Sequence, residues 1–309
     1  MRAMRSGPAT FFHAPAYECN IGPHVFPTLK FRLVRERLVA EGWLRDDEIV
    51  LPRPASREEL LRVHTAAYLD DLEHLRWSPR TLASELPLSR EIVDAYVLAA
   101  GGTTQAARAA MEQGFAANLG GGFHHAFADR AEGFCYINDL AVAARVLQHE
   151  GRARKVAIVD VDVHQGNGTA RVFAGDDTVF TLSLHQEANY PMPKETSDLD
   201  VGLADGTGDA AYLEALERSL ERVWVFAPDL VLLQAGADPY QDDQLGGLAL
   251  TLEGLDQRDR RVLEGCAARD IPAVITFGGG YARRLGDTVE IHTATCRTLL
   301  RLAGAAGRV

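Results

Sequence analysis

Cysteine is scarce in this sequence, and no two cysteines are spaced as a C-x-x-C pair. The chain has four cysteines in 309 residues, which are too few and too scattered for a disulfide framework. The absence of such a framework is typical of proteins in a reducing compartment. We therefore expect a cytoplasmic protein.

Long apolar segments are also absent. No apolar run reaches the ~18 residues that a membrane span requires, and the N-terminal stretch MRAMRSGPATFFHAP lacks the apolar core of a secretory signal. Basic side chains are in the minority, 32 against 43 acidic ones, which gives a formal net charge of −11. We expect no membrane span and no nucleic-acid partner, since nucleic acids and anionic membranes bind basic surfaces. The sequence does not indicate an oligomeric state.

Motifs of several common enzyme classes are missing. The chain has neither the G-x-x-x-x-G-K-[ST] phosphate-binding loop nor the G-x-S-x-G motif of serine hydrolases, and its glycine triplets do not follow the G-x-G-x-x-G pattern. Internal repeats, low-complexity tracts and flexible linkers are absent as well. We expect one domain over residues 1–309, with residues 1–10 as a short N-terminal tail.

The sequence does contain a regular alternation of apolar strands and amphipathic helices from residue 115 onward. Apolar runs of the kind found in buried strands lie at 115–119, 155–163, 178–184, 229–237 and 271–277. Helical periodicity is found at 89–111, 138–150, 209–223 and 251–270, and from about residue 287. The first 75 residues are expected to be irregular and helical. This alternation predicts an α/β fold with an open parallel sheet and helices on both faces.

Each predicted strand runs directly into a polar or glycine-rich loop. These loops read LGGGFHH, DVDVHQGNG, SLH, AGADPYQDD and FGGGY. In a parallel sheet the carboxyl ends of the strands meet at one edge, where the ligands of open α/β sheets bind. We therefore expect the functional site at that edge.

Three polar residues alternate at the end of one apolar strand. With the period of two of a strand, Asp160, Asp162 and His164 would point to one side. Carboxylates together with an imidazole suit Zn²⁺, Fe²⁺ or Mn²⁺, whereas a single such residue would more simply cap the next helix. Asp238 ends the next buried strand and completes an Asp/His/Asp set. Such a set leaves a coordination position open, as catalytic metal sites do.

Two further motifs offer groups for proton transfer and charge stabilisation. His124 and His125 follow three glycines, and imidazole is suited to proton transfer near neutral pH. Tyr281 follows another glycine triplet, and its hydroxyl is able to donate a hydrogen bond to a developing oxyanion. Either motif alone also occurs as packing or on the protein surface.

Together these motifs resemble the histone deacetylase family of amidohydrolases. The family's motifs occur in its order and approximate spacing, as GGGFHHAFADRAEGFCYIND (120–139), VAIVDVDVHQGNGT (156–169), TLSLH (181–185), LLQAGADPYQDD (232–243) and FGGGY (277–281). The segments 13–27 and 195–209 are most similar to the class IV branch and its bacterial relatives. The resemblance implies an arginase/deacetylase-like fold, one catalytic zinc ion and a buried monovalent cation, usually potassium.

The resemblance also implies roles for individual residues. The zinc ligands would be Asp162, His164 and Asp238. His125 would be the general base and acid, supported by His124, and Tyr281 would polarise the scissile carbonyl. The monovalent-cation site would comprise Asp160, Asp162, His164, Ser183 and Leu184. The walls of the substrate channel would include Gly133, Phe134, Tyr190, Gly279 and Gly280.

The resemblance also implies that two residues would hydrogen-bond to the histidines and orient them. Asp160 would accept a hydrogen bond from His124, and Asn167 would orient His125. Many class I members carry an acid where this chain has Asn167. An amide stabilises an imidazolium less than a carboxylate does, so we expect the tuning of His125 to differ here.

The expected substrate is an acylated lysine side chain or another acylated amine. A binuclear manganese ureohydrolase, an acetylpolyamine amidohydrolase and a catalytically silent acyl-lysine binding module are the alternatives. The first would need a further bridging pair of carboxylates, which Asp238-Pro239-Tyr240 does not supply. We also expect a preference for a medium or long acyl chain, because the loop 187–193 contains the adaptable side chain of Met192.

Overall fold

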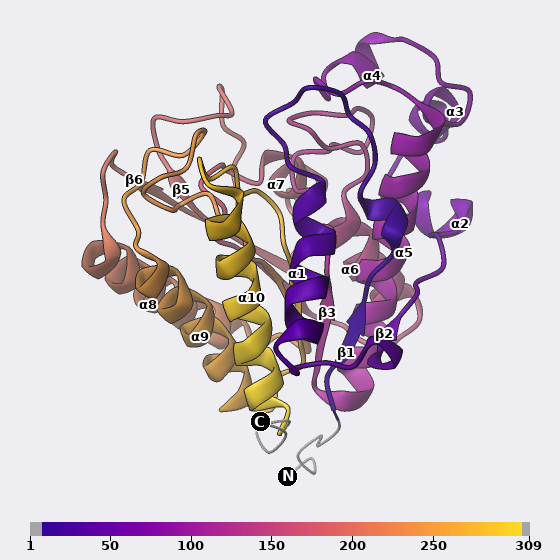
Figure 1. Ribbon diagram of the computed structural model, residues 1–309. Helices are drawn as coiled ribbons and strands as arrows, with labels where there is room; N and C mark the ends of the chain where they lie inside the picture. Colours follow the sequence, from indigo (N-terminus) through magenta and orange to yellow (C-terminus); the bar gives the residue numbers. More distant parts are fainter. Residues whose placement is uncertain (1–7, 305–309) are drawn as a thin grey trace.

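The computed structural model describes residues 8–304, and a sheet of eight strands lies at its centre (Figure 1). All neighbouring strands are parallel, and their order is β2-β1-β3-β8-β7-β4-β5-β6. The strands are β1 Thr10–Phe12, β2 Ile49–Val50, β3 Phe115–Asn118, β4 Val156–Asp160, β5 Val179–Gln186, β6 Leu199–Leu203, β7 Leu230–Gln234 and β8 Ala273–Thr276.

Helices cover both faces of this sheet. They are α1 Leu29–Ala40, α2 Arg57–Leu60, α3 Ala66–Glu73, α4 Pro79–Leu82, α5 Arg90–Gln113, α6 Asp139–His149, α7 Asn167–Val172, α8 Asp209–Phe226, α9 Leu252–Ala267 and α10 Leu285–Leu302. Short 3-10 helices lie at Pro15–Tyr17 and Asp46–Glu48. Within residues 8–304, no helix is both long enough and apolar enough to cross a membrane.

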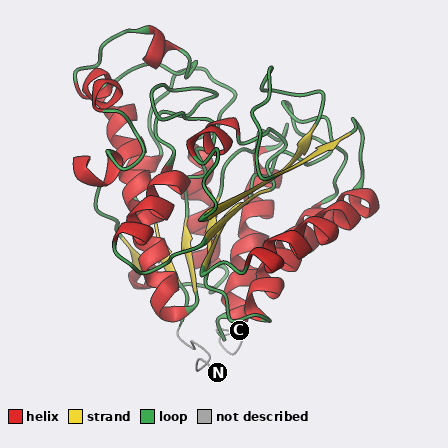
Figure 2. Ribbon diagram, turned by 180° about the vertical axis from the view of Figure 1, so that it is seen from behind, coloured by secondary structure: helices red, strands yellow, loops and turns green. Residues whose placement is uncertain are grey.

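The side chains of the central strands alternate between two cores. In β4, Ala157 and Val159 pack in the core on the side of α8, α9 and α10, whereas Ile158 packs against α5 and α6 on the other side. Figure 1 looks onto the face that carries α1, α8, α9 and α10, and Figure 2 shows the molecule from behind. Both faces of the strand are therefore buried, which explains why its sequence is continuously apolar.

The predicted open parallel sheet with helices on both faces is confirmed, and each of the five predicted buried strands is present. The first 75 residues were expected to be irregular and helical, but they also contain the short strands β1 and β2, which extend the sheet beyond β3. These strands have only three and two residues, which is too short for a recognisable period. Of the expected N-terminal tail, residues 1–7 lie outside the described part of the chain, whereas Thr10 already pairs with Ala116.

The loops that follow the strands lie at one edge of the sheet, as expected. Because all strands are parallel, the segments after β3, β4, β5, β7 and β8 leave the sheet at its carboxyl edge. β4 is shorter than predicted and ends at Asp160, and the backbone N–H of Val161 still donates to the carbonyl oxygen of Gln234 at 3.1 Å. The loops after β4 and β7 therefore begin side by side.

Candidate active site

Three side chains with metal-ligating atoms lie together at the carboxyl edge of the sheet. Asp162 and His164 follow β4, and Asp238 follows the neighbouring strand β7. Their ligand atoms lie within 4.8 Å of one another, and all three side chains are buried. The pairing of β4 with β7 therefore brings together residues that are far apart in the sequence.

The hydrogen bonds around this cluster leave one buried oxygen without a partner. Asp162 Oδ2 accepts hydrogen bonds from Gln234 Nε2 at 2.8 Å and from the backbone N–H of Gly279 at 2.9 Å. Asp238 Oδ2 lies 3.3 Å from His164 Nδ1 but makes no hydrogen bond. A buried polar atom without a partner is costly. A cation bound between the carboxylates would remove this cost, so the residues fit a metal ion.

The electrostatics of the cluster point to the same conclusion. Burial, together with the charge of Asp162, raises the pKa of Asp238 to about 7. Burial lowers the pKa of His164, but the neighbouring carboxylates of Asp162 and Asp238 outweigh this effect and raise it to about 10. A divalent cation held by these three groups would compete with protons for the same atoms. Two carboxylates and one imidazole suit zinc and other first-row divalent ions.

Asp160 lies outside the ligand cluster and contacts a histidine. Its Oδ2 atom is 2.6 Å from Nδ1 of His124. Because β4 ends at Asp160, Asp162 and His164 lie in the following loop and not at alternate positions of the strand, and Asp160 does not join their ligand group. Burial lowers the pKa of His124, but the charges of Asp160 and Asp162 outweigh this effect and raise it to about 9. This imidazole is therefore cationic at neutral pH.

His125 lies beside His124, with ring centroids 4.0 Å apart, but its environment is different. Its Nδ1 atom is 2.7 Å from Oδ1 of Asn167. Burial and the positive charges of His124 and His164 hold the pKa of His125 well below its ordinary value. A neutral imidazole that donates from Nδ1 keeps a lone pair on Nε2. The two adjacent histidines are thus held in opposite charge states, which is typical of an acid–base pair in an active site.

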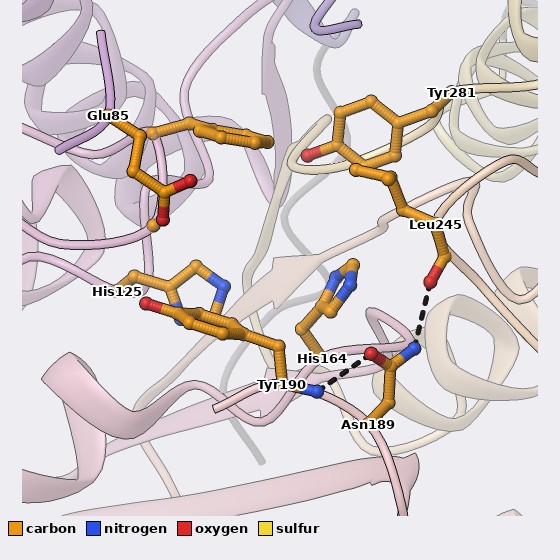
Figure 3. Close-up of a pocket in the computed structure, with 9 residues that line it drawn as sticks. Glu85, His125, His164, Asn189, Tyr190, Leu245 and Tyr281 are labelled. Atoms are coloured by element: carbon orange, nitrogen blue, oxygen red, sulfur yellow. Dashed lines mark hydrogen bonds between the residues drawn. The ribbon is translucent and has the colours of Figure 1, made fainter. Parts of the chain in front are cut away.

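A cavity of about 200 Å³ opens beside these groups (Figure 3). It is lined by Glu85, His125, Gly133, Phe134, His164, Asn189, Tyr190, Leu245 and Tyr281. The rings of His125 and Tyr190 meet edge to face with centroids 5.1 Å apart, and Phe134 meets Tyr281 in the same way at 6.1 Å. In Figure 3 the hydroxyl of Tyr281 points into the space between these rings. The cavity is therefore a slot with largely aromatic walls.

The hydroxyl of Tyr281 is a hydrogen-bond donor at neutral pH. Burial and the negative charges of Asp238 and Asp162 hold the pKa of Tyr281 well above its ordinary value. Its backbone N–H donates to Asp243 Oδ2 at 2.7 Å, which fixes the start of the loop after the glycine triplet. The side chain is only 7 % exposed, so water has little access to it.

Some predicted wall residues occupy other places. Gly279 and Gly280 do not line the cavity, because they lie against the loop of Asp238; a Cβ atom on Gly279 would come within 1.9 Å of Asp238 Oδ2. Met192 is 76 % exposed and does not line the cavity either. Met192 therefore gives no structural support to a preference for a long acyl chain, and that preference stays a prediction. Tyr190, from the same loop, is the residue that reaches the cavity.

Ser183 and Leu184 lie beside the end of β4. Both belong to β5 and are buried, and Ser183 is paired with Asp160 in the parallel register. The Oγ atom of Ser183 is 3.0 Å from Nδ1 of His185. Ser183 and its neighbour Leu184 thus lie beside Asp160, with which they were expected to form the monovalent-cation site.

Several residues around the site were not predicted from the sequence. Lys30 of α1 is fully buried, and its Nζ atom donates to the carbonyl oxygen of Gly278 at 2.6 Å. Burial lowers the pKa of Lys30 to about 8. Lys30 directly precedes Phe31 on a helix with a predicted apolar face, and this position was the only sequence signal that Lys30 is buried. No local pattern marks Glu85 or Leu245, because they reach the cavity from loops that are distant in sequence.

The chain is similar to known proteins over most of its length. A family model described as a histone deacetylase domain matches residues 24–296. An uncharacterized protein of Picosynechococcus sp. is 42 % identical, over 87 % of this chain and 91 % of its own length. Histone deacetylase 2 of Arabidopsis thaliana is 33 % identical, over 86 % of this chain and 73 % of its own length. The crystal structure of an HDAC homolog complexed with SAHA matches with a TM-score of 0.82 at 29 % identity, over 96 % of this chain and 84 % of that one.

Substitution of the ligand residues tests the metal site. Asp162→Ala and Asp238→Ala are expected to abolish metal binding but not folding, because both side chains lie in loops at the edge of the sheet. Asp160→Ala is expected to weaken metal binding or activity by ~10–100-fold, as substitutions next to metal ligands do. Metal content after dialysis measures the first effect, and circular dichroism measures folding. Asp242→Ala is the control, because Asp242 is an exposed aspartate in the same loop as Asp238. Retention of a full metal equivalent by Asp162→Ala would contradict the assignment of the metal ligands.

Proposed function

Because this chain belongs to the histone deacetylase family of amidohydrolases, we propose that it removes acyl groups from lysine side chains with one zinc ion. Asp162, His164 and Asp238 would hold this ion. The observation that carries the proposal is the partnerless Oδ2 atom of Asp238, together with the position of His164 in the cavity wall. The ligand set is therefore accessible from the cavity in which a substrate would bind.

The bound zinc ion would polarise the amide carbonyl and lower the pKa of a water molecule. The protein contributes a rigid ligand set, because Gln234 and Gly279 both donate hydrogen bonds to the same oxygen of Asp162. We also propose that oxygens of Asp160, Asp162, His164, Ser183 and Leu184 hold a potassium ion. The pairing of Ser183 with Asp160 supports this second site.

His125 is the proposed general base. It is neutral, it lines the cavity, and its Nδ1 atom is engaged by Asn167, so Nε2 is free to accept a proton from water. The same nitrogen then donates this proton to the leaving lysine amine. His124, held as a cation by Asp160, stabilises the negative charge that develops on the substrate.

The walls of the cavity are suited to an acylated lysine. Tyr281 donates its hydroxyl proton to the carbonyl oxygen as negative charge develops there. The aromatic rings of Phe134 and Tyr190 provide apolar surface for the methylene groups of the lysine side chain. These rings also reduce the access of water to the reacting groups, which strengthens the electrostatic interactions around them.

The structure offers little support for the binuclear ureohydrolase alternative. A second metal ion would require free carboxylates close to Asp238. Within residues 8–304, the group of side chains placed to hold a metal ion comprises Asp162, His164 and Asp238 and does not include the nearby Asp243. An acetylpolyamine amidohydrolase would use the same residues as a lysine deacylase, so the substrate assay has to distinguish the two.

The proposed partner is an acylated lysine in a protein or peptide, or another acylated amine. Nucleic acid is not proposed as a partner, because the net charge is −11. All four cysteines are free thiols, as is usual in a reducing compartment. On that basis we propose a cytoplasmic location.

The proposed function is tested with one peptide that carries acetyl-, decanoyl- or myristoyl-lysine, beside an acetylated polyamine. We expect hydrolysis of at least one acyl-lysine peptide, its loss after chelation and its recovery on addition of zinc. Tyr281→Phe is expected to keep the metal and to lower kcat by ~10²–10³-fold, as the loss of an oxyanion donor does. Hydrolysis of the polyamine alone, or no hydrolysis by the zinc-loaded protein, would contradict the proposal.

Substitution of the two histidines tests their division of labour. His125→Ala is expected to lower kcat by ~10²–10⁴-fold, the usual contribution of a general acid–base group. His124→Ala is expected to have a smaller effect, because its charge acts on the reaction without proton transfer. Both variants should retain the metal, since neither side chain is in the ligand set. Equal losses of kcat, or loss of the metal in either variant, would show that the roles are assigned wrongly.

A further inference from the structure

The carboxylate of Glu132 lies behind the amide of Asn167. Asn167 Nδ2 donates to Glu132 Oε1 at 2.6 Å, and Asn167 Oδ1 is 2.7 Å from Nδ1 of His125. Asn167 is only 1 % exposed, so water does not compete for its amide group. The three side chains thus form a continuous series of hydrogen bonds that runs from the imidazole to a carboxylate.

This carboxylate determines the direction of each hydrogen bond in the series. A carboxylate only accepts hydrogen bonds, so the NH₂ group of Asn167 has to face Glu132. The carbonyl oxygen of Asn167 then faces His125, and the proton of the neutral imidazole has to be on Nδ1. An amide without such a partner could turn over and present its NH₂ group to the ring, because its two ends are nearly equal in size. Glu132 therefore selects the tautomer in which Nε2 is the basic atom.

Glu132 also connects the two walls of the cavity. Its Oε1 atom accepts a hydrogen bond from the hydroxyl of Tyr190 at 3.3 Å. Its backbone begins a tight turn, in which Glu132 and Cys135 exchange hydrogen bonds of 3.0 and 2.8 Å. Within this turn a Cβ atom on Gly133 would lie 2.6 Å from Cδ2 of His125. One residue thus links the imidazole to both sides of the slot.

A surface ion pair does not explain this arrangement. Glu132 Oε2 is 3.3 Å from Nε of Arg130, and the side chain of Arg130 is 38 % exposed. Exposed pairs of this kind contribute little to stability. The Oε1 atom, by contrast, faces Asn167 and Tyr190, both of which border the reacting groups.

We propose that Glu132 is the positioning residue of the general base, acting through Asn167 on the tautomer of His125 and through Tyr190 on the opposite wall of the cavity. The kinetic part of this inference rests on the proposed function, whereas the tautomer of His125 is measurable without a substrate. In a protein with a carboxylate at position 167, that carboxylate would accept the hydrogen bond of the imidazole directly. Here the carboxylate of Glu132 does so indirectly, through the amide of Asn167.

Exchanging the positions of the carboxylate and the amide provides a direct test. In Glu132→Gln the new amide both donates and accepts, so the orientation of Asn167 is no longer selected. In Asn167→Asp two carboxylates face each other without a proton donor, and they repel. In the double variant, the carboxylate at position 167 accepts from His125 and from the amide at position 132. The original direction of the hydrogen bonds is then restored.

On the zinc-loaded protein, each single substitution is expected to lower kcat by about 10–100-fold, as is typical of residues behind an active site. The double variant should have a higher kcat than either single variant, because the two substitutions compensate each other. Tyr190→Phe removes only the hydroxyl contact and should change KM more than kcat. Glu59→Gln is the control, since it removes a carboxylate that is ion-paired with Arg53 and Arg108 and does not line the cavity.

Nitrogen chemical shifts of the His125 ring, measured by NMR on the zinc-loaded protein, report the tautomer independently of activity. We expect a ring protonated on Nδ1 in the unsubstituted protein and a mixture of tautomers in Glu132→Gln. Unchanged shifts and kcat in Glu132→Gln, or a double variant whose loss equals the product of the single losses, would overturn the inference. An inactive unsubstituted protein whose tautomer still responds to Glu132→Gln would refute the proposed function but support the positioning role.

Discussion

Three aspartates at the carboxyl edge of the sheet are almost completely buried, and the other groups of the site compensate their negative charge. Asp160, Asp162 and Asp238 are 2 %, 1 % and 0 % exposed, and burying a carboxylate is costly unless it is paired and hydrogen-bonded. Asp160 contacts His124, which also lies 3.8 Å from Asp162, whereas Asp162 and Asp238 share His164 and fit a metal ion. The negative charges raise the pKa of His124, whereas burial and the neighbouring positive charges lower the pKa of His125. The same electrostatic constraint therefore shapes both the cluster that fits a metal ion and the pair of histidines beside it.

The loop after β4, which contains Asp162, and the loop after β7, which contains Asp238, are held close together. A Cβ atom on Gly236 would lie 2.3 Å from Asp162 Oδ2, so only glycine permits the loop after β7 to approach the carboxylate so closely. Arg258 of α9 is fully buried and donates to the carbonyl oxygens of Val161 and Gly236 at 3.1 and 2.7 Å. It thereby connects the loop after β4 with the loop after β7, and its charge is balanced by Asp259 at 2.7 Å. Arg258 of α9 thus helps to set the distance between Asp162 and Asp238, the candidate metal ligands.

The fold was predictable because apolar runs and helical periods specify its strands and helices locally, whereas the choice of Asp162, His164 and Asp238 as the ligand set came from the resemblance to the deacetylase family. A continuous apolar run predicts a strand buried on both faces, and parallel strands necessarily place their following loops at one edge. The role of Glu132 was not predictable, since its neighbours Asn167 and Tyr190 belong to other loops whose positions depend on the whole fold. Lys30 likewise contacts Gly278, which is 248 positions away. The short strands at the N-terminal edge were missed for a different reason: they form because a neighbouring strand offers free backbone groups, and their own sequences carry no clear period.

The central claim is that one divalent cation, held by Asp162, His164 and Asp238, is sufficient for amide hydrolysis. The most direct measurement starts from metal-free protein and follows the hydrolysis of an acyl-lysine peptide while zinc is added in fractions of an equivalent. We expect a linear rise in activity that ends at one zinc ion per chain. An end point at two ions per chain, or full activity before any zinc is added, would contradict it.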